Sequence, residues 1–134
     1  MNSYFDRFRD PLVLVGRLLM AVIFVGAGYS KIGGYEATQG YMASMGVPGA
    51  LLPLVIFAEL GGGVAIALGF LTRLAALGLA VFSIASAVIF HGGSADQIQQ
   101  IMFLKNLAMA GGFLFLVAHG GGRYTLDAKL FGAK

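Results

Sequence analysis

Four long apolar stretches divide the chain, at residues 12–30, 51–70, 74–91 and 102–119. Each contains roughly 18–20 residues, which is the length that a helix needs to cross a hydrocarbon core of about 30 Å. Their apolar residues are continuous rather than alternating, so the pattern predicts membrane-spanning helices and not the strands of a barrel. We therefore expect an all-α integral membrane four-helix bundle, built as a single transmembrane domain over residues 1–134.

The connection between the first two stretches carries a further helical pattern. Tyr35, Thr38, Met42 and Met45 recur at helical intervals. The glycines and the proline that follow, at residues 46–49, would end a helix there. We expect a short helix at residues 35–45, resting on the outer mouth of the bundle.

The basic residues outside the apolar stretches indicate how the chain is oriented. Of these basic residues, only Lys31 lies on the side opposite the termini, whereas all the others lie on the side of the termini. By the positive-inside rule, this asymmetry places both termini in the cytoplasm. The residues on that side are Arg7, Arg9, Arg73, Arg123, Lys129 and Lys134.

Composition agrees with a membrane protein and excludes several kinds of chemistry. Charged residues make up 11% of the chain, against about 25% in soluble domains. Because there is no cysteine, the chain alone provides no disulfide, thiolate nucleophile, iron–sulfur ligand or cysteine zinc site. The net charge of +3 follows from the basic span ends, so it does not indicate a nucleic-acid partner.

Three charged residues lie inside the apolar stretches, where each costs roughly 2.5–3.5 kcal/mol on insertion scales. Glu59 lies between Arg17 and Lys105 in depth, so either cation could reach it. Asn106 adjoins Lys105, and His91 ends the third stretch near the same depth. We predict that these five residues form a ligand-binding or ion-pair cluster.

Two interpretations of this cluster remain open. Intramembrane charges often mark a functional pathway, and here they could hold a polar headgroup or relay protons in an outward-opening cavity. Alternatively, they form a satisfied ion pair that only fixes helix rotation. The spacing of histidines and carboxylates does not suggest a metal site. No self-contained catalytic motif is present, and the triple glycines lack the strand–helix context of a nucleotide-binding loop.

Several short motifs together resemble the DoxX family of small bacterial membrane proteins. The resemblance extends over roughly residues 13–127, and each motif is weak alone. The loop at residues 40–53 is similar to that of an inner-membrane branch of the family. The motifs are Gly16-Arg17, Phe24, Gly28 and Lys31; Ala58-Glu59-Leu60-Gly61-Gly62; Gly69-Phe70-Leu71-Thr72-Arg73; Lys105-Asn106; and Gly120–Gly122 with Arg123, Tyr124 and Asp127.

The resemblance implies a multi-pass protein of the bacterial inner (plasma) membrane. The wider family includes subunits of a thiosulfate:quinone oxidoreductase and a mycobacterial member linked to a membrane complex for oxidative stress. It thus implies quinone-linked redox chemistry or redox homeostasis. Since the chain shows no cofactor ligand of its own, electron transfer would require a bound quinone, another bound cofactor or a partner redox subunit.

The leading hypothesis is an inner-membrane protein that binds a quinone-like or other amphipathic small molecule, as a subunit or accessory of a redox or oxidative-stress system. A second hypothesis is a small transporter or proton-linked permease. The chain shows no repeated half of the kind that transporters use, so this would require a homo-oligomer. A third is a non-catalytic scaffold that recruits a soluble redox partner through Arg73 and the basic C-terminal tail.

Overall fold

The computed structural model describes residues 2–93 and 95–132. Four of its helical segments are long and apolar enough to cross a membrane, which confirms the predicted all-helical architecture. Lys134, one of the charges used to predict orientation, lies outside the described residues. The segments are α2 (Arg9–Gly33), η1 with α4 (Gly49–Leu51 and Leu52–Leu68), α5 with the π-helix η2 (Thr72–Ser86 and Ala87–His91), and α6 (Gln97–His119).

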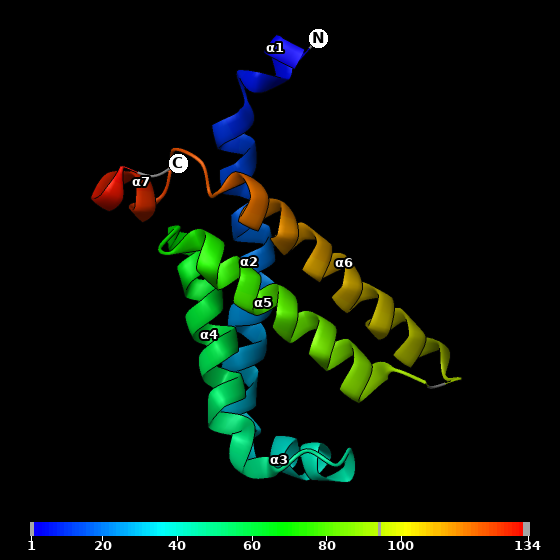
Figure 1. Ribbon diagram of the computed structural model, residues 1–134. Helices are drawn as coiled ribbons and strands as arrows, with labels where there is room; N and C mark the ends of the chain where they lie inside the picture. The colour runs from blue at the N-terminus through cyan, green and yellow to red at the C-terminus, as the bar shows by residue number, and fades with distance from the viewer. Residues whose placement is uncertain (1, 94, 133–134) are drawn as a thin grey trace.

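The four segments form two antiparallel pairs. Helix α2 packs along α4, and α5 packs along α6. The pairs lie close together at the end that holds both termini and diverge toward the opposite end (Figure 1). Which end faces the cytoplasm remains a prediction from the basic residues.

Two spans begin or end several residues beyond the predicted limits. Both differences change where a lysine lies relative to its helix. Helix α2 continues to Gly33, so Lys31 belongs to its last turn rather than to a loop. Helix α6 begins at Gln97 because the side chain of Asp96 accepts a hydrogen bond from the backbone N–H of Ile98 and caps it. Lys105 therefore lies about 12 Å along its helix, deeper than the sequence suggests.

Close packing holds the pairs together, as expected in lipid, where helices associate without a hydrophobic driving force. A methyl group at Gly28 would lie 2.7 Å from Cγ of Leu60, so α2 and α4 approach at a residue without a side chain. Between the pairs, the rings of Phe24 and Phe113 meet edge to face with centroids 5.3 Å apart. Both rings are buried.

Three short helices flank the bundle. They are α1 (Asn2–Asp6), α3 (Tyr35–Ser44) and α7 (Leu126–Phe131). The predicted helix between the first two spans is therefore present as α3, at the end opposite the termini (Figure 1). Its location on the outer surface of the membrane remains a prediction.

Candidate functional site

A pocket of about 510 Å³ lies at the end where the helix pairs diverge. Its walls are mostly apolar, with a few polar side chains among aromatic and methionine residues. All four spans and α3 contribute to it. The lining residues are Ile23, Phe24, Ala27, Lys31, Thr38, Tyr41, Met42, Val47, Leu51, Val55, Glu59, Phe82, Ser83, Ala85, Ser86, Ile89, Phe90, His91, Met102, Lys105, Asn106 and Met109.

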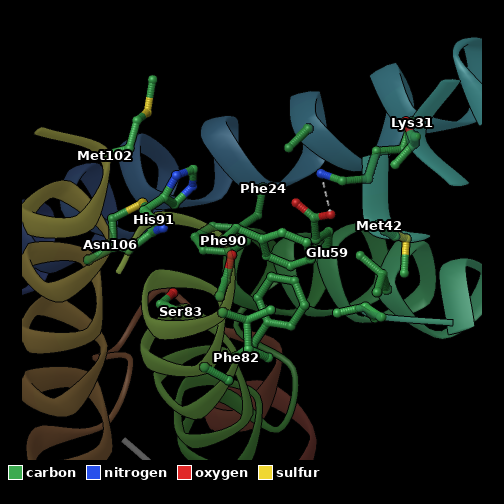
Figure 2. A pocket seen from close by; sticks show the side chains of 18 of the residues that line it. Phe24, Lys31, Met42, Glu59, Phe82, Ser83, Phe90, His91, Met102 and Asn106 are labelled. Atoms are coloured by element: carbon green, nitrogen blue, oxygen red, sulfur yellow. Dashed lines mark ion pairs between the residues drawn. The ribbon is translucent and has the colours of Figure 1, made fainter. Parts of the chain in front are cut away.

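An ion pair between Lys31 and Glu59 forms one wall. Nζ of Lys31 lies 2.7 Å from Oε1 of Glu59, and only 5% of the Glu59 side chain is exposed. Side chains lean toward the N-terminus of their own helix. Because α2 and α4 run antiparallel, Lys31 leans inward from the end of α2 while Glu59 leans outward along α4. In Figure 2 the second carboxylate oxygen of Glu59 points away from Lys31.

The facing wall carries a second polar group. His91 ends the π-helix η2, and its ring nitrogen Nδ1 is hydrogen-bonded to the side-chain oxygen of Gln99. Asn106 and Lys105 reach the pocket from α6. Figure 2 shows His91 and Asn106 across the pocket from Lys31 and Glu59, with Phe90 between the two groups. Polar atoms thus lie at two sides of an otherwise apolar space.

The π-helix η2 widens the end of α5 at the pocket, a departure from α-helical geometry that recurs at functional sites. It brings Phe90 against Tyr41 of α3, with ring centroids 5.6 Å apart and nearly parallel planes. This stack connects α3 to the second helix pair at the end where the pairs diverge. About two turns before Phe90, the hydroxyl of Ser83 is buried in the pocket wall without a hydrogen-bond partner among the described residues.

Four of the five predicted site residues therefore share one pocket: Glu59, His91, Lys105 and Asn106. The fifth, Arg17, does not belong to this cluster. The expectation that Arg17 could pair with Glu59 is wrong, because Lys31 occupies that position. Arg17 lies about two turns into α2 and is hydrogen-bonded to Tyr124 of the C-terminal segment. The start of α2 and the C-terminal segment are both at the end of the bundle that holds the termini (Figure 1).

Arg17 instead anchors the C-terminal segment. Only 1% of its surface is exposed. Its Nη2 donates a hydrogen bond of 2.7 Å to the backbone oxygen of Tyr124, and its charge acts on Asp127. The guanidinium also lies against Gly69, where a Cβ atom would collide with Nη1. These contacts give Arg17 a structural role.

Asp127 completes this second cluster by capping α5 from a distant part of the chain. Its carboxylate accepts hydrogen bonds from the backbone N–H groups of Leu71, at 2.6 Å, and Thr72, at 2.8 Å. Partial burial alone raises the pKa of Asp127. The N–H groups of Thr72 and Leu71 and the charge of Arg17 outweigh this effect, and the pKa lies below the ordinary aspartate value.

Sequence reasoning missed three contributions to these sites. The predicted span ends at residue 30 and leaves Lys31 in a loop, although Lys31 directly follows that residue and α2 in fact continues to Gly33. Ser83 carried no signal, since serine is common in spans. Asp127 was singled out only as part of a family motif. No local pattern indicated that it caps a helix far away in the sequence.

The fold and pocket define a small helical membrane protein with an internal, mostly apolar cavity. The family model described as DoxX matches residues 12–92. The chain is 50% identical to inner membrane protein YqjF of Escherichia coli, over 92% of this chain and 95% of that protein. It is 36% identical to inner membrane protein YphA of the same organism, over 96% of this chain and 100% of that protein. No solved structure matches.

The chain therefore belongs to the DoxX family and is a small inner-membrane protein in contact with the lipid bilayer. The motifs that resembled this family gather at the two places just described. Phe24, Lys31, Glu59 and Lys105-Asn106 lie at the pocket. The motifs around Arg17, Gly69 and Asp127 meet at the other end.

Proposed function

We propose that this protein binds an amphipathic small molecule in the pocket between its helix pairs. Quinones are the ligand class that the family resemblance suggests, and the corresponding role is a subunit or accessory of a membrane redox or oxidative-stress system. The observation that carries the proposal is an apolar cavity of about 510 Å³ with polar side chains on two facing walls.

The size and chemistry of the cavity suit such a ligand. Small-molecule pockets span about 300–1,000 Å³ and combine apolar walls with a few placed polar groups. Here Phe24, Phe82 and Met109 supply apolar surface. Hydrogen-bond donors come from the amide of Asn106 and the hydroxyl of Ser83, and both could serve a ring carbonyl.

The unpartnered hydroxyl of Ser83 is the strongest sign that a polar ligand atom belongs here. Buried hydroxyls in native proteins are usually hydrogen-bonded, yet this one has no partner among the described residues. Because Ser83 lines the pocket, a change of its side-chain rotamer would bring the hydroxyl to a ligand oxygen. On the opposite wall, the carboxylate oxygen of Glu59 that points away from Lys31 could accept a hydrogen bond from a ligand hydroxyl, while Lys31 holds the carboxylate in place.

A quinone, when bound, would supply the electron-transfer chemistry that this cysteine-free chain lacks. The chain's own residues would bind and orient its ring and exclude water from it. The α3 helix lines one side of the pocket and is connected to the second helix pair by the stack of Tyr41 on Phe90. A partner subunit would then complete an electron path.

The test is binding of tritiated decylubiquinone to the full chain in phosphatidylcholine nanodiscs. Ala27→Phe places a ring inside the pocket, whereas Val22→Phe adds the same ring on the exposed surface of the same helix. We expect saturable binding that Ala27→Phe weakens about tenfold or more, equivalent to about 1.4 kcal/mol. Val22→Phe should bind as wild type does. Equal binding by both variants would overturn the proposal.

A further inference from the structure

We propose that the pocket prefers amphiphiles whose headgroup carries one negative charge, and that Lys105 is the counter-ion of this headgroup. The inference rests on the proposed function, since it concerns the same pocket. It narrows the preferred ligand from amphiphiles in general to anionic ones, so that an anionic amphiphile binds more tightly than a neutral one such as an oxidised quinone.

The charges around the pocket do not balance. Lys31, Lys105 and Glu59 are the lining residues with a formal charge when histidine is neutral. Lys31 and Glu59 compensate each other across 2.7 Å. Within residues 2–93 and 95–132, Lys105 forms no ion pair. The described pocket therefore carries one uncompensated positive charge.

The depth of Lys105 makes this imbalance significant. It follows the start of α6 at Gln97 by eight residues, so it lies well inside a membrane span. Charged side chains at such positions generally pair with another group or line a polar cavity. The side chain of Lys105 leans toward the N-terminus of α6, which is the end where the helix pairs diverge.

Neighbouring groups favour an oxygen-rich anion in particular. Asn106, next to Lys105, brings an amide with two N–H donors to the same pocket. The buried hydroxyl of Ser83 has no partner in the described part of the chain. An ammonium, an amide and a hydroxyl are complementary to a carboxylate or phosphate, whose oxygens only accept. The apolar walls would then hold a hydrocarbon tail.

Two sources could supply this chemistry: a free carboxylate amphiphile, or the phosphate of an anionic phospholipid. The simple rival is that Lys105 snorkels to the headgroup region and binds nothing. Dodecanoate and dodecanol are matched probes, because they share a tail and differ in headgroup charge. Dihexanoylphosphatidylglycerol represents the phospholipid source.

The experiment measures how each probe displaces a tritiated tail-matched photoprobe from the full chain in neutral phosphatidylcholine nanodiscs. The variants are Lys105→Met and Lys105→Arg, with Lys129→Met as a control on the exposed helix α7. Comparing each variant with wild type cancels the different partitioning of the probes into lipid.

We expect Lys105→Met to weaken the binding of dodecanoate by about tenfold or more, because the bound headgroup loses its counter-ion, and to leave the binding of dodecanol unchanged. Lys105→Arg should restore dodecanoate binding, and Lys129→Met should have no effect. A larger loss for dihexanoylphosphatidylglycerol than for dodecanoate would assign the site to phospholipid.

Two results would overturn the inference. If Lys105→Met changes the binding of dodecanoate and of dodecanol equally, or changes neither, Lys105 is not a counter-ion. Retained binding of decylubiquinone, abolished by Ala27→Phe, would then leave the proposed function standing by itself. If no probe, decylubiquinone included, binds the wild type, both proposals fail together.

Discussion

Replacing Asp127 by alanine should destabilise the bundle, although Asp127 lies outside the spans. The substitution removes both acceptors for the N–H groups of Leu71 and Thr72 at the start of α5. It also removes the carboxylate whose charge Arg17 faces. The turn it supports is strained, because Leu71 adopts a left-handed conformation with φ of 48°.

The size of the effect follows from two scales. Hydrogen bonds to a charged acceptor contribute about 1.5–3 kcal/mol when shielded from water, and the partial exposure of Asp127 discounts this. Loss of a helix N-cap costs about 0.5–2 kcal/mol. We expect a loss of about 2 kcal/mol, or roughly 30-fold in the folding equilibrium.

The assay is equilibrium unfolding in mixed detergent micelles, followed by circular dichroism. Lys129→Ala, on the same short helix, is the matched control and should stay within about 0.5 kcal/mol of wild type. Because folding lowers the pKa of Asp127, its contribution is fully present above the unfolded value of about 3.9. It is lost as pH falls through the lower folded pKa. Equal stability of Asp127→Ala and Lys129→Ala at neutral pH would refute the reasoning.

Three further predictions concern the other contacts described above. Gly69→Ala should lower stability by more than about 1–2 kcal/mol, because the residue is left-handed and its Cβ would meet Arg17; wild-type unfolding would contradict this. Lys31→Met should cost about 3–5 kcal/mol by leaving the buried carboxylate of Glu59 unpaired. The double variant with Glu59→Gln should recover most of that loss, and a double-mutant cycle in the same unfolding assay would show no coupling if the pair is unimportant. Ser83→Ala should leave stability within about 0.5 kcal/mol, since its hydroxyl has no described partner, but should weaken decylubiquinone binding; unchanged binding would place the ligand elsewhere.

The architecture could be predicted because the spans carry a strong local signal. Continuous apolar stretches of membrane length have few alternatives, and all four appear as helices. The short helix α3 also followed from spacing, since Tyr35, Thr38 and Met42 share one side of it. Its contact with the pocket through Tyr41 depends on tertiary packing that spacing does not reveal.

The composition of the pocket could be predicted only in part. Glu59, Lys105, Asn106 and His91 are polar residues in the outer halves of their spans, and the structure places all four around one cavity. Whether they hold a ligand or only an ion pair remains a prediction.

The pairing of charges could not be predicted, because depth does not fix the rotation of a helix. Arg17 and Lys31 both lie on α2, but they serve opposite ends of the bundle. Arg17 finds its partner at Tyr124, more than one hundred residues away in the chain. A contact of that range depends on how the C-terminal segment folds back, and no local pattern records it.

Native mass spectrometry of the detergent-purified protein, with extraction of bound lipids, tests most directly whether the pocket is a ligand site. Wild type would be compared with Glu59→Gln, which keeps the shape of the side chain and removes its charge. We predict a discrete amphiphile bound to wild type and lost from the variant. A wild type without any specific ligand, and a variant that is merely less stable, would make the Lys31–Glu59 pair purely structural and contradict the proposed function.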